Sequence, residues 1–256
     1  MGLEELLTSP YVVLSVLLLF SFLPPILFLI WVRNSERFAR EPWFAVIKVF
    51  VWGAIFAVII AILLSWGASW LYDRYAPPYV LFGTKQTIET FMLVLVIAPF
   101  VEEGAKAIGI YTASFNITEV EDGLVYGAAS GLGFSATENL FYGVAAMVTL
   151  GPAVSVQLIM LRSVSSTLLH ASATSATGFG IGRNAVSNGK YRVLPFYLTA
   201  VTMHAAFNFF ASFGGLYRSV FGDVADTFGF WAALIFAVVT FSLMRFRILK
   251  KDARIA

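Results

Sequence analysis

The sequence predicts an all-α integral membrane protein, a polytopic bundle of about seven transmembrane helices. Hydrophobic residues make up 59% of the chain and charged residues only 12%, about half of the roughly 25% that soluble globular proteins carry. Apolar stretches long enough to cross a bilayer recur at 11–32, 43–72, 87–113, 123–149, 153–182, 193–214 and 225–246. These observations predict a multi-pass protein of a cell membrane.

The first apolar stretch predicts a retained span and not a cleaved signal peptide. No basic segment precedes it, and Arg33, Arg37 and Arg40 follow it as a stop-transfer signal does. Basic residues gather after the first and fifth stretches and in the tail, eleven against three on the opposite side. The positive-inside rule therefore predicts an N-terminus outside and a C-terminus in the cytoplasm.

The connections between the stretches are short, which predicts a single transmembrane domain over 1–256. None exceeds about 15 residues, too few for a separate folded domain. The net charge of +2 gives no reason to expect a nucleic acid, and the absence of cysteine excludes disulfides and thiolate chemistry. Any chemistry is therefore expected in the bilayer or at its surface.

The third stretch carries Glu102, Glu103 and Lys106 inside the membrane. A charged side chain near the bilayer centre costs about 2.5–3.5 kcal/mol, so such residues are usually paired or functional. Glu102 and Lys106 stand four residues apart in the favourable ion-pair order, whereas Glu103 points about 100° away from Glu102. An ion pair thus accounts for Glu102 but not for Glu103. Pro99, just upstream, is expected to free the carbonyl of Leu95 and to kink the helix.

The next three stretches each place polar residues on one helical face. Glu138 follows a stripe of small residues that lets another helix approach closely, so it is expected to face the bundle. The only two histidines, His170 and His204, lie in the middle of the fifth and sixth stretches, and Asn208 follows one turn later. Five residues of this polar group carry a formal charge, three glutamates against Lys106 and Arg162, and they sum to −1, one proton or one cation short of neutral.

These residues favour carboxylate-based hydrolysis. The aspartates lie at the ends of the stretches or beyond, the histidines are too far apart for a HExxH motif, and no nucleophile motif surrounds a serine. A buried glutamate can act as general base toward water. Glu138, His170 and His204 would supply a catalytic site for a divalent metal such as zinc. In the metal-free alternative no cofactor is needed, and His204 with Asn208 donates hydrogen bonds to an oxyanion.

Four motifs follow one another over 87–214: Glu102-Glu103-x-x-Lys106, Gly131-x-Gly133-Phe134-x-x-x-Glu138-Asn139, Leu169-His170-Ala171 and His204-Ala-x-x-Asn208. In this order they resemble the PrsW family of intramembrane proteases, which is similar to the CAAX-prenyl endopeptidases and to the polytopic scaffold subunit of gamma-secretase. The resemblance implies an endopeptidase whose substrate is a membrane protein in the lipid bilayer, such as the single-span anti-sigma factor cleaved by a bacterial relative. It also implies that Glu102 and Glu103 are the essential pair, completed by Glu138, His170 and His204.

The hypothesis from the sequence is intramembrane proteolysis, in which one of the two adjacent glutamates activates water and Lys106 holds one carboxylate ionised. His170 and His204 bind a metal or the oxyanion. Glu138 either binds the metal as well or orients the other groups of the site. A non-catalytic membrane scaffold or binding protein is the first alternative, because a scaffold protein shares the resemblance. An ion-coupled transporter is the second, because the charges inside the bilayer sum to −1.

Overall fold

The computed structural model describes residues 9–36, 40–75, 89 and 91–255; most of these residues are helical, joined by short turns, and this part contains no strand. The predicted all-α fold is confirmed. In chain order the elements are α2 (Pro10–Arg33), α3 (Trp43–Val51), the π-helical segment η1 (Trp52–Ala57), α4 (Val58–Tyr75), the π-helical segment η2 (Met92–Ile97), α6 (Ala98–Tyr111), the 3-10 turn η3 (Ser114–Asn116), α7 (Asp122–Leu150), α8 (Pro152–Val186), α9 (Leu194–Phe221) and α10 (Asp223–Ile255).

Four helical stretches in the described residues are long and apolar enough to cross a membrane: Tyr11–Arg33, Trp43–Tyr75, Pro152–Val186 and Asp223–Lys250. The other three predicted spans coincide with η2 and α6 together, with α7 and with α9. The polytopic architecture is therefore confirmed, whereas the count of seven spans and the orientation stay predictions. Residues 87, 88 and 90 of the third span, and the basic residues Arg37 and Lys85, lie outside the described residues.

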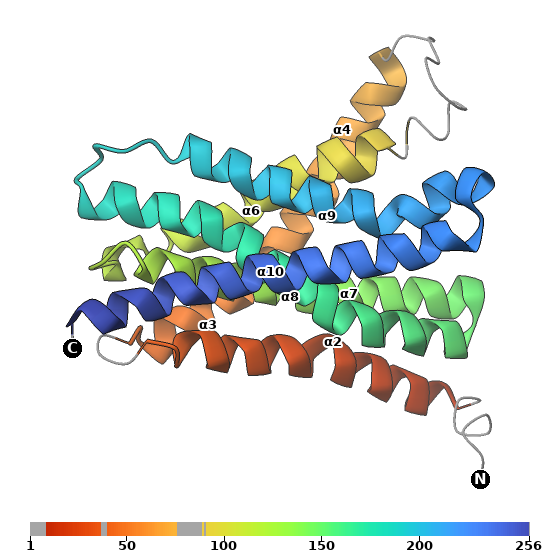
Figure 1. Cartoon of the computed structure of the whole chain (residues 1–256), viewed down its shortest axis with the longest axis horizontal. Coiled ribbons are helices and arrows are strands. Elements are labelled where there is room, and N and C mark those ends of the chain that lie inside the picture. The colour runs from red at the N-terminus through yellow and green to blue at the C-terminus, as the bar shows by residue number, and fades with distance from the viewer. Residues whose placement is uncertain (1–8, 37–39, 76–88, 90, 256) are drawn as a thin grey trace.

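The helices α2, α7, α8, α9 and α10 run side by side along the long axis of the molecule, while α4 leans away from them (Figure 1). Two of the connections at one end of the bundle are tight turns made by glycine. Gly151 joins α7 to α8 with φ of 90°, and Gly222 joins α9 to α10 with φ of 60°. Positive φ is open to glycine at no steric cost, which explains the residue type at both turns.

The helix pair α7 and α8 forms the centre of the bundle, with its backbones in close contact. A Cβ atom on Gly123 would overlap the carbonyl of Gly178, and one on Gly131 would overlap the carbonyl of His170. On the opposite face of α7, a Cβ atom on Gly133 would overlap the carbonyl of Phe50 in α3. The small-residue stripe therefore does what the sequence predicts, because it lets α7 lie directly against its neighbours. This contact brings Glu138 and His170 into one layer.

Candidate active site

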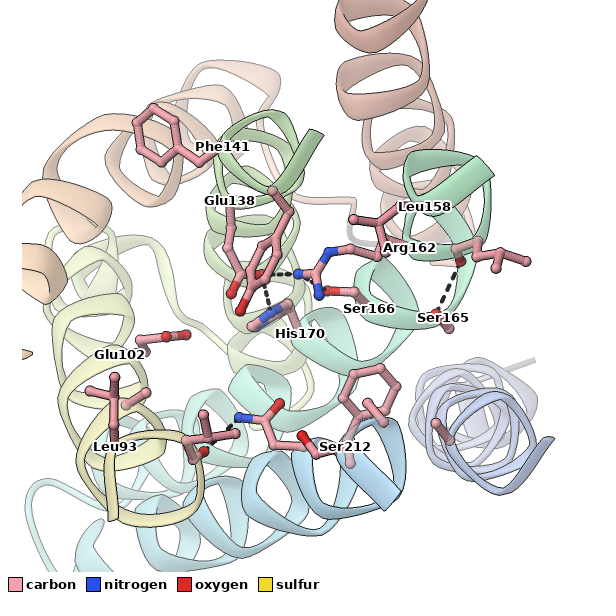
Figure 2. Close-up of a pocket in the computed structure, with 18 of the residues that line it drawn as sticks. Leu93, Glu102, Glu138, Phe141, Leu158, Arg162, Ser165, Ser166, His170 and Ser212 are labelled. Atoms are coloured by element: carbon pink, nitrogen blue, oxygen red, sulfur yellow. Dashed lines mark hydrogen bonds and ion pairs between the residues drawn. The ribbon is translucent and has the colours of Figure 1, made fainter. Parts of the chain in front are cut away.

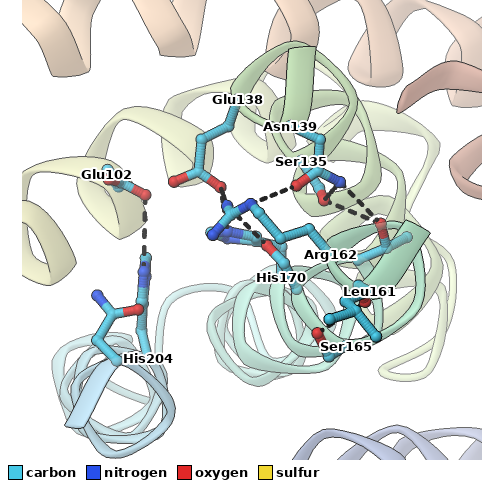
Figure 3. Close-up of polar contacts among 12 residues, drawn as sticks. Glu102, Ser135, Glu138, Asn139, Leu161, Arg162, Ser165, His170 and His204 are labelled. Atoms are coloured by element: carbon cyan, nitrogen blue, oxygen red, sulfur yellow. Dashed lines mark hydrogen bonds and ion pairs between the residues drawn. The ribbon is translucent and has the colours of Figure 1, made fainter. Parts of the chain in front are cut away.

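Four helices bring the buried polar residues of the bundle together at one level (Figure 3). The site is built where α6, α7, α8 and α9 meet, and α7 and α8 form its floor through their close backbone contact. The residues that contribute to it are Glu102, Glu103 and Lys106 on α6, Glu138 on α7, Arg162 and His170 on α8, and His204 and Asn208 on α9. All seven residues proposed from the sequence as catalytic thus lie close to one another, and their roles stay proposals.

Lys106 lies at the centre of this group and is completely buried. Its Nζ atom lies 2.7 Å from Glu103 Oε1, 2.8 Å from His170 Nδ1 and 3.6 Å from Glu102 Oε2. The ammonium also lies 4.2 Å from the centroid of the Phe134 ring, a cation–π distance. The closest ion pair of Lys106 is therefore with Glu103, although the sequence favoured Glu102 as its partner.

Glu103 has no solvent exposure, and both of its oxygens are engaged. Oε1 accepts hydrogen bonds from Lys106 and from Nδ1 of His204, at 2.7 and 3.0 Å. Oε2 accepts a hydrogen bond of 2.9 Å from the hydroxyl of Thr174. A buried carboxylate with all these donors is well compensated for the loss of water. Glu103 consequently ties α6 to α8 and α9.

Glu102 differs from its neighbour in both exposure and bonding. Its side chain is 12% exposed and lines a cavity. Its Oε2 atom is buried and has no hydrogen-bond partner among the described residues, although Nε2 of His204 lies 3.7 Å away. Buried polar atoms of native proteins rarely lack a hydrogen-bond partner. Where one does, a function or an absent ligand is the usual reason.

The cavity has a volume of about 610 Å³ and reaches from the polar group to the end of the bundle where α9 meets α10 (Figure 2). Its polar lining includes Glu102, Glu138, Arg162, His170, Asn208 and Asp226. Most of the remaining lining is apolar and comes from α4, η2, α7, α8, α9 and α10. A concave, mainly apolar space with a few convergent polar groups is the usual form of a binding site.

The two histidine rings lie edge to face, with 4.8 Å between their centroids. Each ring places one nitrogen against a carboxylate: Nε2 of His170 lies 3.0 Å from Glu138, and Nδ1 of His204 lies 3.0 Å from Glu103. Such carboxylate–histidine pairs are the usual second shell of metal-binding histidines, because the carboxylate fixes the ring and its tautomer. The other nitrogens, Nδ1 of His170 and Nε2 of His204, then carry the lone pairs of the site.

The possible metal-ligand set in the described residues is Glu102, His170 and His204, whose ligand atoms lie within 4.8 Å of one another. The sequence favoured Glu138 as the carboxylate of this set. In the structure Glu138 Oε2 contacts Nε2 of His170 and Nη2 of Arg162, at 3.0 and 2.8 Å. The donor set of two imidazoles and one carboxylate suits zinc. The unpartnered oxygen of Glu102 and the formal charge of −1 in the group also fit a cation.

Asn208 lines the cavity and also joins α9 to η2, since its Nδ2 atom donates a hydrogen bond of 2.9 Å to the carbonyl of Val94. The sequence expectation for this helix assumed the α-helical register. In the π-helical register the N–H of Ala98 bonds to Leu93, five residues back, so the carbonyl opposite Pro99 is that of Val94 and not of Leu95. Asn208 supplies the donor that Pro99 lacks.

Three further residues hold the site together but were not predicted as site residues. Thr174 donates to Glu103, and Arg162 and Asn139 form a hydrogen-bonded pair beside Glu138. The signal was present for Thr174 and Arg162, which lie on the same helical face as His170. Asn139 directly follows Glu138 in one of the motifs.

Comparison with known proteins decides the family. Residues 41–244, which contain the whole polar group, match the family described as PrsW family intramembrane metalloprotease. The chain belongs to the PrsW family. A curated relative, "Protease PrsW" of Clostridioides difficile (strain 630), is 27% identical over 201 residues, which cover 75% of this chain and 78% of the relative. No solved structure matches the chain.

Membership of the PrsW family confirms the prediction of an intramembrane protease made from the four motifs. The chain is a multi-pass membrane protein whose substrate is a membrane protein in the bilayer. The family description as a metalloprotease agrees with the possible ligand set of Glu102, His170 and His204. Protease membership also favours the catalytic hypothesis over the scaffold and transporter alternatives.

Proposed function

We propose that this intramembrane protease uses Glu102 as the carboxylate that activates the attacking water. The observation that carries the proposal is the contrast between two adjacent glutamates. Glu102 lines the cavity and has a carboxylate oxygen without a hydrogen-bond partner, whereas Glu103 is buried and bonded through both oxygens. A general base must lie where water can reach it, and of the two carboxylates only Glu102 lines the cavity.

Glu103 then has a supporting role, together with Lys106. Its carboxylate is an acceptor only, so His204 Nδ1 must carry the proton of the 3.0 Å hydrogen bond between them. Nε2 of a neutral His204 therefore presents a lone pair toward Glu102. A lone pair suits a metal ion and cannot donate to an oxyanion, which favours the ligand role of His204 over the oxyanion role.

A divalent ion such as zinc would be held by Glu102, His170 and His204. When bound, it would supply a Lewis acid that polarises the scissile carbonyl and makes a bound water more acidic. Glu138, already engaged with Arg162 and Nε2 of His170, orients that histidine and stays outside the ligand set. Glu102 would use one carboxylate oxygen as a ligand, so its other oxygen is the one that takes the proton from water, and Lys106 offsets the charge of the adjacent Glu103.

The substrate segment occupies the apolar part of the cavity, whose volume of about 610 Å³ accommodates a short stretch of unwound chain. Asn208 faces the same space. One N–H of its amide is committed to the carbonyl of Val94, and an amide group has a second N–H. We propose that this second N–H donates to the carbonyl oxygen of the scissile bond.

Cleavage of a single-span membrane substrate in proteoliposomes tests the role of Glu102. We expect Glu102→Gln to abolish cleavage while the protein keeps its fold, because the amide keeps the size of the side chain and removes its basicity. Glu103→Gln is expected to lower both cleavage and stability. Glu121→Gln, outside the site, serves as the matched control and should cleave like the wild type. Full cleavage by Glu102→Gln would refute the proposal.

Metal content of the purified protein tests the ligand set. We expect about one equivalent of a divalent metal in the wild type and a loss of that metal in Glu102→Gln and His204→Ala. Glu138→Gln should retain most of the metal, since Glu138 is outside the proposed ligand set and contacts His170 through Nε2, which leaves Nδ1 as the ligand atom. Metal loss in Glu138→Gln with retention in Glu102→Gln would restore the set expected from the sequence.

A further inference from the structure

Arg162 is a partly buried cation that the proposed chemistry does not use. It lies on α8 at the wall of the cavity, with a side chain 17% exposed. Its Nη2 atom donates to Glu138 Oε2 at 2.8 Å and to Ser166 Oγ at 3.2 Å, and its Nε atom donates to Asn139 Oδ1 at 3.0 Å. The guanidinium carbon also lies 3.7 Å from the ring centroid of Tyr142. The plane and the direction of the guanidinium are both determined by these contacts.

Asn139 is itself held in place, so the contact with Arg162 has a defined direction. Its Nδ2 atom donates to Ser135 Oγ and to Thr167 Oγ1, each at 3.3 Å, and is completely buried. The amide oxygen is therefore the atom that remains for Arg162. Figure 3 shows this chain of contacts from Asn139 through Arg162 to Glu138.

The chain of contacts ends on the imidazole ring of His170. Glu138 Oε2 receives a hydrogen bond from Arg162 and lies 3.0 Å from Nε2 of His170. An ionised carboxylate accepts and does not donate, so Nε2 of His170 must carry a proton. On the other side of the ring, the Lys106 ammonium only donates, and its 2.8 Å contact requires a lone pair on Nδ1. Both contacts therefore require the same tautomer of His170, with the proton on Nε2 and the lone pair on Nδ1.

A simple neutralising role for Arg162 does not account for this geometry. Any cation near Glu138 would balance its charge, and a lysine would do so with one flexible ammonium. Arginine instead presents a rigid, planar fork of donors, which matches the three acceptors on Glu138, Asn139 and Ser166. The structure uses this fork to hold the Glu138 carboxylate at one place beside His170.

We propose that Arg162 is a positioning residue which, through Glu138, keeps the proton of His170 on Nε2 and so directs the Nδ1 lone pair toward the reaction centre. The effect of Arg162 on cleavage rests on the proposed function. The tautomer of His170 does not depend on that function, because it follows from the contacts of the ring with Glu138 and Lys106.

Nitrogen-15 NMR of histidine-labelled full-length protein in nanodiscs measures the tautomer directly. The chain has only two histidines, and His204→Gln identifies the signals of His170. We expect the wild type, with and without EDTA, to show a proton on Nε2 of His170. In Arg162→Gln and Arg162→Lys the Lys106 contact is the one that remains to hold the tautomer, so the His170 signals should shift part of the way toward a mixture of tautomers, while the His204 signals stay close to their wild-type positions.

Kinetics with the reconstituted substrate provide the second readout. Loss of an outer partner of a metal-binding or catalytic group typically costs about 10–100-fold, and we expect a loss of that size in kcat for Arg162→Lys, with KM changed by less than about 3-fold. Because Arg162 acts through Glu138, the double variant Arg162→Lys/Glu138→Gln should be no slower than Glu138→Gln alone. Independent effects would instead multiply.

The matched control is Arg218→Gln, which removes another arginine–carboxylate pair. Arg218 lies 2.7 Å from Asp223 at the exposed end of α9, so its loss should change neither the His170 signals nor kcat. Unshifted His170 signals in both Arg162 variants would overturn the proposal, as would multiplicative kinetic effects. A wild type that binds no metal and cleaves no substrate would refute the proposed function, and the NMR result would still decide the role of Arg162.

Discussion

Replacing Lys106 by methionine tests how the site tolerates its buried charges. The side chains of Lys106 and Glu103 are both 0% exposed and their charged atoms lie 2.7 Å apart. Removing one partner of a buried ion pair costs about 3–5 kcal/mol, because it leaves an uncompensated charge. Glu103 keeps its hydrogen bonds to Thr174 and His204, so we expect a loss of about 3 kcal/mol, at the lower end of that range.

Removing both charges should reverse much of this loss. In Lys106→Met/Glu103→Gln the carboxylate closest to the lost ammonium is neutral as well and only Glu102, 3.6 Å from that ammonium, keeps its charge; replacement of a buried pair by neutral groups is often close to neutral for stability. We expect the double variant to be more stable than Lys106→Met by about 1–2 kcal/mol. Such an increase on adding a second substitution would identify the unpaired charge as the cause.

Equilibrium unfolding of the purified protein in mixed micelles, followed by circular dichroism, measures these differences without a substrate. Lys48→Met is the matched control: Lys48 is exposed and bonds a backbone carbonyl, so its loss should cost less than about 1 kcal/mol. The reasoning is refuted if Lys106→Met is as stable as the control variant, or if the double variant is the least stable of the four proteins.

Two further substitutions test the packing around the site. Gly131→Ala introduces a Cβ that overlaps the α8 backbone; we expect cleavage to fall by up to about 100-fold, as for an ångström-scale misplacement, and Gly67→Ala, which meets open space, to cleave normally. Equal cleavage by both variants would contradict the close packing. Asn208→Ala leaves the Val94 carbonyl without its donor and should lower the free energy of unfolding by about 1–3 kcal/mol. The same change at Asn184, whose bond to a backbone carbonyl is exposed, should cost clearly less, and equal losses would contradict the interpretation.

Much of the architecture follows from the sequence because its causes are local. Apolar length gives the helical segments, and residues three or four apart on a helix share a face whatever the helix packs against. The polar faces that carry Glu138, His170 and His204 were therefore predictable, as was the close approach made possible by the glycine stripe of α7. The order of the motifs was sufficient to predict the family.

The identity of the carboxylate at the reaction centre depends on packing between helices. Glu102 and Glu103 differ by one residue, and periodicity alone says only that they point in different directions. Thr174 on α8 and His204 on α9 bond to Glu103, in addition to Lys106 of the same helix, and Glu102 is left at the cavity.

The sequence by itself determined a polytopic helical protein whose ionisable residues lie on four successive helices. Tertiary structure alone decided which of them meet: Glu102 lies close to the two histidines, and Glu138 forms an ion pair with Arg162. The π-helical segment η2 likewise moved the freed carbonyl from Leu95 to Val94. The physical reason is the same in each case, because a helix places its side chains by its own register, while their partners depend on how neighbouring helices are rotated and aligned against it.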